Sequence, residues 1–165
     1  MTAPLSPEIT NQLGGLIVQG IKLLQQLQEL LETELDALKS RDLEALEQSN
    51  RDKHECLLAF DRSIRERNAL LDQLQIGHDR DSVLALIAQA PQPDSGRLNN
   101  GWHKLESALE KVKLLNQRNE QVLVRNKQNA DQLLALLQGH AKGNTIYDQR
   151  GDKGRYEGQR SLGKA

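Results

Sequence analysis

The feature that most constrains the fold is a spacing of leucines by three and four residues that recurs along three long segments of the chain. Such spacing gathers apolar side chains on one face of an α-helix and is typical of helix bundles and coiled coils. The composition agrees, because 30 Leu and 13 Ala stand against 7 Ile, 5 Val, one Phe, one Trp and two Tyr, whereas strands favour β-branched and aromatic residues. We therefore expect an all-α protein and exclude a β-sandwich, a barrel and a Rossmann-like enzyme.

The first segment predicts a long helix over about residues 6–39. Its start carries a capping hydroxyl on Ser6, then Pro7 and the acidic Glu8, and all three favour a helix N-terminus. We use the word seam for the line of residues that faces the neighbouring helices. The expected seam of this helix contains Leu13, Ile17, Gly20, Leu24, Leu27, Leu31, Glu34 and Leu38.

The second segment predicts another long helix over about residues 42–75, with Asp42 as its N-cap. Its expected seam contains Leu43, Leu46, Asn50, Lys53, Leu57, Phe60, Ile64, Arg67, Leu71 and Leu74. The apolar pattern changes phase between the two segments, and a uniform rod would not accommodate that offset. The two helices are therefore expected to form a long antiparallel hairpin, or coiled coil, closed by a tight reversal at residues 39–42.

A short connecting helix is expected over about residues 80–89 and a third long helix over about 97–138. Two prolines and a glycine argue that Pro91–Gly96 is not helical, and Gly139 is expected to end the third helix. Residues 139–165 hold 6 of the 12 glycines and few apolar residues, which predicts a disordered tail. The expected organisation is one helical domain, residues 1–138, followed by that tail.

The charge and the hydropathy pattern limit the partners and the compartment. The net charge is −1, so no basic field favours nucleic acid. The most apolar stretch, residues 13–31, contains glutamines and charged residues that prevent it from spanning a bilayer. The chain begins without the features of a secretory signal, and its single Cys56 has no disulfide partner. We expect a cytoplasmic protein that neither binds nucleic acid nor inserts into a membrane.

The sequence motifs for catalysis are weak. The stretch Gly158–Ala165 resembles a phosphate-binding loop, but Ala165 stands where a Ser or Thr would hold Mg²⁺. None of the four histidines follows a glutamate by three residues, the spacing found in di-iron helical bundles. Cys56 lacks the neighbours of a catalytic thiol. We therefore expect no cofactor, no metal site and no enzymatic activity.

The third helix has an unusual seam, in which asparagines interrupt the apolar stripe. That seam contains Leu98, Trp102, Leu105, Leu109, Val112, Asn116, Asn119, Leu123, Asn126, Ala130, Leu133 and Leu137. One interpretation is that the asparagines specify register, because a polar residue in a seam excludes wrong alignments. The other is that this end of the helix packs incompletely on its own chain and offers a groove to the helix of another protein.

The order of these features is similar to that of a known family. A leucine-rich first helix is followed by Arg41–Leu46, Lys53, Leu57–Leu58, Arg67, Leu70–Leu71, Trp102, Leu105, Asn116–Asn119 and the tail stretch Thr145–Gly151. Over about residues 13–151 this order resembles the flagellar export chaperones of the FlgN type. The resemblance implies a chaperone that keeps the amphipathic terminal helices of the hook–filament junction proteins FlgK and FlgL from assembling early. It also implies delivery of these clients to FlhA, the export gate protein of the flagellar type III secretion apparatus.

The resemblance also suggests site residues. Tyr147 would dock on the export gate, and the client face would contain Val122, Leu123, Asn126, Ala130, Leu133 and Leu137. The interrupted seam adds Asn116 and Asn119 to this client-binding set. The alternative is a structural coiled-coil scaffold, or an oligomerisation module, without a dedicated client. A homo-oligomer is compatible with either function.

Overall fold

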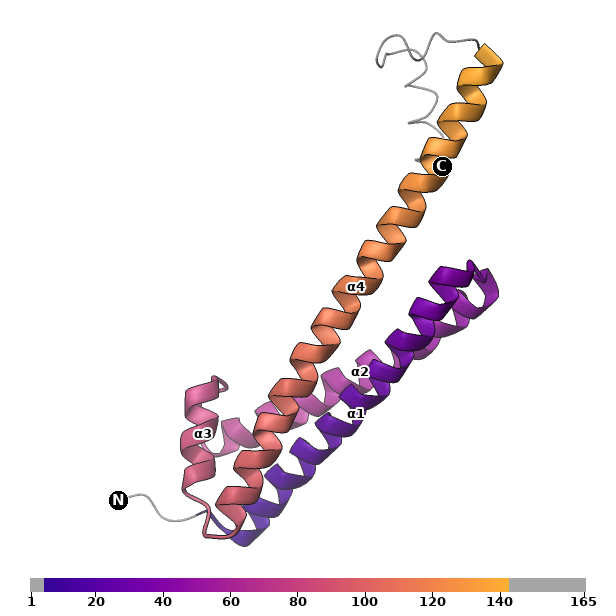
Figure 1. The fold of residues 1–165 in the computed structure, drawn as a ribbon. Coiled ribbons are helices and arrows are strands. Elements are labelled where there is room, and N and C mark those ends of the chain that lie inside the picture. The colour runs from indigo at the N-terminus through magenta and orange to yellow at the C-terminus, as the bar shows by residue number, and fades with distance from the viewer. Residues whose placement is uncertain (1–4, 143–165) are drawn as a thin grey trace. The chain divides into compact units, whose positions relative to one another are not determined.

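The computed structural model describes residues 5–142, and four helices lie within that range. They are α1 (Pro7–Ser40), α2 (Leu43–Gln73), α3 (Arg80–Ala88) and α4 (Asp94–Lys142). Figure 1 shows α1 and α2 as an antiparallel hairpin, with the short α3 beside the end of α2. The expected all-α architecture, with a helical hairpin, a short third helix and a long last helix, is confirmed. The tail from residue 143 onward lies outside the described residues.

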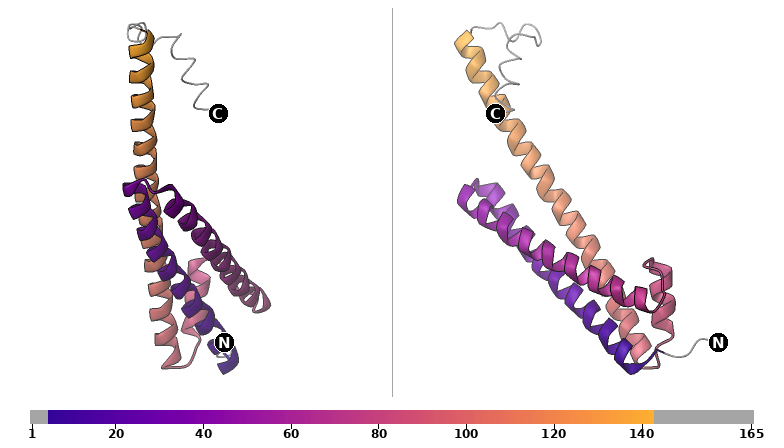
Figure 2. Two further views of the ribbon diagram at one scale, coloured as in Figure 1. Left: turned by 90° about the vertical axis from the view of Figure 1, so that its right-hand side faces the viewer. Right: turned by 180° about the vertical axis from the view of Figure 1, so that it is seen from behind.

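The chain divides into two units, Met1–Asn119 and Glu120–Ala165, and α4 contributes to both. Unit 1 contains α1, α2, α3 and the first half of α4. Two further views show that α1 lies next to both α2 and this first half of α4 (Figure 2). The described part of unit 2 is the remainder of α4, a single helical segment.

The hairpin turn uses two residues and neither glycine nor proline. Arg41 ends α1 in the left-handed conformation, with φ 56° and ψ 37°, which reverses the chain. Asp42 then caps α2, since its carboxylate accepts a hydrogen bond from the Ala45 amide at 3.1 Å. At the other end of α1 the Ser6 hydroxyl accepts from the Ile9 amide at 3.2 Å. The expected caps and the expected reversal are therefore confirmed.

Within unit 1, α4 packs parallel to α1 at close range. A Cβ added to Gly14 would meet the Leu98 side chain at 3.4 Å. One added to Gly20 would meet the Leu105 side chain at 2.9 Å. The contacts advance together along both helices, which fixes the parallel direction. The glycines of α1 thus provide the space that the α4 leucines fill.

The core of unit 1 is built on the seam of α1. All eight residues expected in that seam are buried. Five of them belong to one cluster with Leu71 of α2, Val83 and Ile87 of α3, and Trp102 and Leu105 of α4. These five are Leu13, Ile17, Leu24, Leu27 and Leu31. The apolar spacing was sufficient to predict this face, because α2, α3 and α4 cover a broad sector of α1 and the leucines of α1 occupy that sector.

The expected seam of α2 was wrong at three of its ten positions. Leu43 is 75% exposed, Leu57 is 44% exposed, and Asn50 is also exposed. Of the other seven expected residues, Leu71 is buried and the rest are half-buried. The buried positions in this helix are Ser49, Cys56, Ser63, Leu70 and Leu71. Most of them lie one residue before the expected position in each heptad. Small side chains occupy these positions because α1 approaches closely there, as the contact from the Cys56 thiol to the Leu23 carbonyl at 3.4 Å shows.

Two expected helix boundaries were also wrong. Pro91–Gly96 was expected to be non-helical, yet α4 begins at Asp94. The prolines are compatible with this start, because the Pro91 carbonyl accepts a hydrogen bond from the Ser95 amide at 3.1 Å. A proline at the start of a helix also removes no hydrogen bond of the helix, since the first amides have no partner within it. Gly139 does not end α4, which continues to Lys142. A glycine within a helix costs only about 1 kcal/mol relative to alanine, so it does not have to end one.

Candidate partner-binding surface

The polar residues of the three seams in unit 1 meet in one buried cluster. Glu34 of α1 and Asn119 of α4 are 6% and 2% exposed. The Lys53 ammonium of α2 lies 2.7 Å from Glu34 Oε2. Asn119 Nδ2 donates to Glu34 Oε1 at 2.8 Å and to the Leu31 carbonyl at 2.7 Å. Each long helix therefore contributes one seam residue to a shared hydrogen-bonded group.

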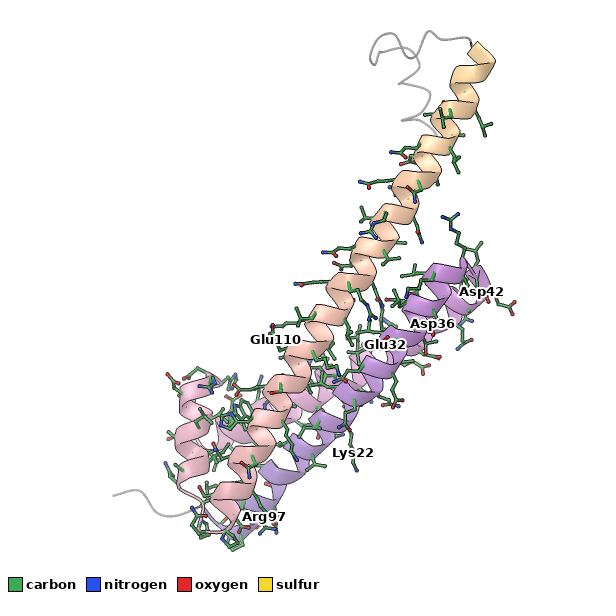
Figure 3. The ribbon with its side chains drawn as sticks, in the orientation of Figure 1. Lys22, Glu32, Asp36, Asp42, Arg97 and Glu110 are labelled. Carbon is green, nitrogen blue, oxygen red and sulfur yellow. The ribbon has the colours of Figure 1, made fainter. Side chains whose placement is uncertain are left out.

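The hydrogen-bonding capacity of Asn119 is used within its own unit. Besides the two bonds from Nδ2, its Oδ1 accepts from Arg118 Nε at 3.1 Å. Arg118 also pairs with Glu32 of α1 at 3.0 Å, and Glu32 is labelled in Figure 3. This arrangement matches the register interpretation for Asn119, because a wrong alignment of α4 on α1 would leave the buried amide unpaired. Contact with a partner would require the amide to exchange these bonds.

A second polar seam residue, Arg67 of α2, also has a structural environment. Its guanidinium lies 5.1 Å from the ring centroid of Trp102, a cation–π arrangement. Burial lowers the pKa of Arg67 from its ordinary value. Burial likewise raises the pKa of the Cys56 thiol, which favours the unreactive protonated form. Neither group is arranged for chemistry on a substrate.

The second half of α4 exposes large apolar side chains. Leu123, Leu133 and Leu137 are 51%, 58% and 67% exposed. At 100° per residue these three lie within about 80° of one another, and the exposed Ala130 lies between them. Val122 and Asn126 of the expected client face are half-buried, as is Asn116 in unit 1. The expected face therefore contains a row of exposed leucines.

Three large apolar residues of α4 that are more than half exposed lie outside that face. Leu114, Val124 and Leu136 are 57%, 53% and 53% exposed, and their helical positions lie about 180°, 100° and 140° from Leu123. Val124 does not continue the three-four spacing of the seam and was not expected to be part of a binding face. Tyr147, the residue expected to dock on the export gate, lies outside the described residues.

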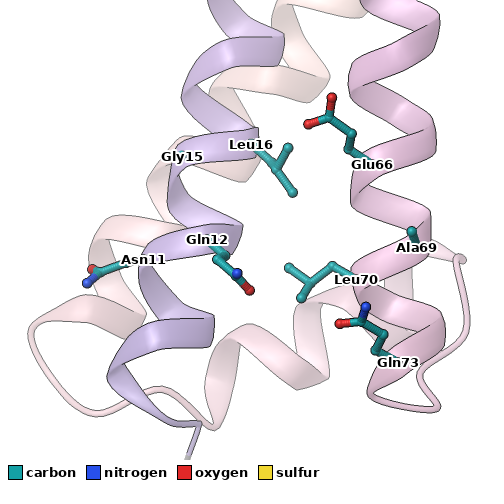
Figure 4. A pocket seen from close by; sticks show the side chains of 8 residues that line it. All are labelled: Asn11, Gln12, Gly15, Leu16, Glu66, Ala69, Leu70 and Gln73. Atoms are coloured by element: carbon teal, nitrogen blue, oxygen red, sulfur yellow. The ribbon is translucent and has the colours of Figure 1, made fainter.

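A groove also opens between α1 and α2 (Figure 4). Its volume is about 460 Å³, and it is lined by Asn11, Gln12, Gly15, Leu16, Glu66, Ala69, Leu70 and Gln73. The side chains of Leu16 and Leu70 point into this space from opposite helices. No residue of this groove was expected from the sequence, because it arises from the spacing between two helices.

Two classes of site are absent from residues 5–142. No helix in this range combines the length and the apolar character needed to cross a membrane. Among the same residues, no three His, Cys, Asp or Glu side chains are grouped so that they could hold a metal ion.

Comparison with known proteins gives a consistent result. The profile of the FlgN protein family matches residues 1–155. The crystal structure of a flagella synthesis protein FlgN from Pseudomonas aeruginosa is similar, with a TM-score of 0.62 and 24% identity. That similarity covers 77% of this chain and 94% of the bacterial protein, and it shows a shared fold. A search of curated proteins finds no match.

Proposed function

Because the chain belongs to the FlgN family, a family of flagellar export chaperones that are not enzymes, we propose that it is a cytoplasmic chaperone for the hook–filament junction proteins FlgK and FlgL. It binds their amphipathic terminal helices and delivers them to the export gate protein FlhA. The observation that supports this most directly is the row of exposed leucines on the second half of α4.

The client face consists of Val122, Leu123, Asn126, Ala130, Leu133 and Leu137. A helix of the client packs its own apolar stripe along this face, as the helices of a coiled coil do. Asn116 and Asn119 stand at the border of this face in unit 1, where Asn119 is already hydrogen-bonded.

The expected affinity suits a carrier that must release its client. Covering three half-exposed leucines contributes about 1–2 kcal/mol each, less than full burial would give. Contacts from the rest of the client helix add to this, while association and ordering costs remove a large share. Binding in the micromolar range leaves the client protected but free to dissociate without covalent chemistry.

The decisive experiment places carboxylates on the client face. The variant Leu123→Asp/Leu133→Asp should weaken binding of FlgK and FlgL by about 30-fold or more. The apolar side chains of the client that contact these two positions would then face a carboxylate. The matched control is Val124→Asp/Leu114→Asp, which adds two carboxylates at equally exposed positions of α4 away from that face. Isothermal titration calorimetry measures the affinities, and circular dichroism checks that helicity is unchanged.

Two results would contradict the proposal. Equal losses in the two double variants would show that general apolar content, and not this face, sets the affinity. Alternatively, sedimentation could show a stable homo-oligomer that gains no thermal stability when FlgK is added, although a ligand of the folded state should raise it. That outcome would favour the structural scaffold.

Docking at the export gate is assigned to Tyr147 on the basis of the family resemblance. Replacing Tyr147 with Ala should leave the affinity for FlgK within about twofold, since the client face does not include this residue. The same variant should reduce binding to FlhA and the amount of FlgK secreted into the medium. A large loss of FlgK affinity would instead assign Tyr147 to the client site.

A further inference from the structure

A second candidate surface lies wholly within unit 1, along the line where α1 and α4 pack side by side. Two cavities follow this line, with volumes of about 440 Å³ and 410 Å³. The first lies beside Gly14, Gly15 and Val18 of α1, and the second beside Ile21 and Gln25 of the same helix. Both are also lined by α4, so they form successive parts of one groove, which we call the α1–α4 groove.

Several residues that line the groove are small and apolar. Val18 is 50% exposed there, and Gly101 and Ala108 line it from α4. A Cβ on Gly101 would meet Ile17 at 3.1 Å, so helix packing accounts for that glycine. A Cβ on Gly15 would meet nothing within 4 Å. A glycine in a helix interior lowers stability, and no contact among the described residues explains it at position 15.

The rim of the groove is basic along its second cavity. Its α4 side contains Lys104 and Lys111, which are two helical turns apart and therefore on one face. Neither lysine forms an ion pair with any residue in the described part of the chain. The one carboxylate in the lining, Asp94, is paired with Arg97, and Arg97 is labelled in Figure 3. The unpaired charge is thus positive.

We propose that the α1–α4 groove binds an acidic amphipathic helix of a partner protein. The centres of the two cavities lie about 11 residues apart along α1, or about 16 Å. A partner helix laid along the groove would place one apolar side chain in each cavity, at positions i and i+11 of the same face. Its acidic flank would pair with Lys104 and Lys111, and its backbone would approach α1 at Gly15. This site is separate from the client face and does not depend on the proposed function.

The probe is a fluorescein-labelled helical peptide of about three heptads, with leucines on one face and glutamates on its flanks. Fluorescence anisotropy at low salt should show binding of this peptide to the full chain, and much weaker binding of a peptide with lysines in place of the glutamates. Amide chemical shifts should change at Val18, Ile21 and Ala108. Added salt should weaken the complex, because part of the attraction is between exposed charges.

Three variants test the groove itself. Lys104→Glu/Lys111→Glu should weaken binding about tenfold or more through like-charge repulsion. The control Lys39→Glu/Lys113→Glu changes the net charge equally at exposed positions outside the lining, and should change affinity less than about twofold. Gly15 also lines the α1–α2 groove, so the chemical shifts at Val18, Ile21 and Ala108 decide which groove holds the peptide. Gly15→Leu should abolish binding by filling the α1–α4 groove. It should keep or raise the melting temperature, since the site is open and leucine favours helix.

The proposal is overturned if the acidic peptide does not bind, or if the lysine peptide binds equally well. It is also overturned if the shifts fall on Leu123–Leu137 and not on the groove, or if Gly15→Leu leaves the affinity unchanged. Sedimentation provides the last check. A dimer that dissociates on Lys104→Glu/Lys111→Glu would show that a second copy of this chain covers the groove, which would also reject the proposed partner.

Discussion

Residues 94–119 and residues 120–139 belong to one helix and continue one apolar repeat, yet most of that repeat is buried in the first part and its leucines are exposed in the second. Leu109, at 36% exposed, is the exception in the first part. Leu98, Trp102 and Leu105 are 5–7% exposed, whereas Leu123 and Leu137 are 51% and 67% exposed. The repeat itself therefore does not determine burial. The two parts differ in what packs against them. In the first part the side chains of α4 pack against α1, where glycines leave room for them. The second part exposes the same kind of apolar face to solvent.

The largest effect is expected when one leucine is replaced in each of the two parts of α4. Leu105→Ala should lower the free energy of unfolding by about 3 kcal/mol, because it leaves a cavity against α1. Leu123→Ala should lower it by less than about 0.5 kcal/mol, since half of that side chain is already in contact with water. Urea unfolding followed by circular dichroism measures both. Equal losses would mean that the second half of α4 is covered in solution.

The sequence predicted the buried part well where large apolar residues mark the contact. In α1 every expected seam residue is buried, and the polar interruptions Glu34, Lys53 and Asn119 lie in the seams where their spacing placed them. That they would bond to one another could not be predicted, because it depends on the register between helices. Residues 31, 34, 53 and 119 are adjacent only after α1, α2 and α4 have packed.

The sequence predicted less where small residues mark the contact. Ser49, Cys56 and Ser63 of α2 are buried in the core of unit 1. A hydropathy pattern does not distinguish a small residue at a close contact between helices from a small residue at the surface. The client face was placed by its leucines and by family resemblance, and the structure shows those leucines exposed. The α1–α4 groove was not expected, because a groove is a property of two surfaces and neither helix reveals it alone.

An intermediate effect is expected at the end of the buried part of the helix. Asn119→Ala should lower the free energy of unfolding by about 2 kcal/mol, because it leaves Glu34 Oε1 and the Leu31 carbonyl without their donor in a buried site. Asn129→Ala, at an exposed position of the same helix, should change it by less than about 0.5 kcal/mol.

A double-mutant cycle tests whether the Asn119 effect comes from the cluster. In a Glu34→Ala background, Asn119→Ala should cost clearly less than it does alone, because the two residues share a hydrogen bond. If the two losses simply add, Asn119 contributes through packing alone, and the buried cluster does not hold α4 in register.

The smallest effect concerns the glycines of α1, where covered and open surfaces lie close together on one helix. Gly15→Ala should raise the free energy of unfolding by about 0.5–1 kcal/mol, because alanine favours the helix and the added methyl group meets nothing. Gly20→Ala gains the same propensity but brings its Cβ to 2.9 Å from Leu105, so the core must shift and little or no stabilisation should remain. Thermal unfolding of the two variants side by side measures the difference. If Gly15→Ala failed to stabilise the protein, another molecule would already cover the surface of α1 at Gly15, and the added methyl group would displace it. The α1–α4 groove would then not be open in solution, and the exposure of the second half of α4 would need the same test.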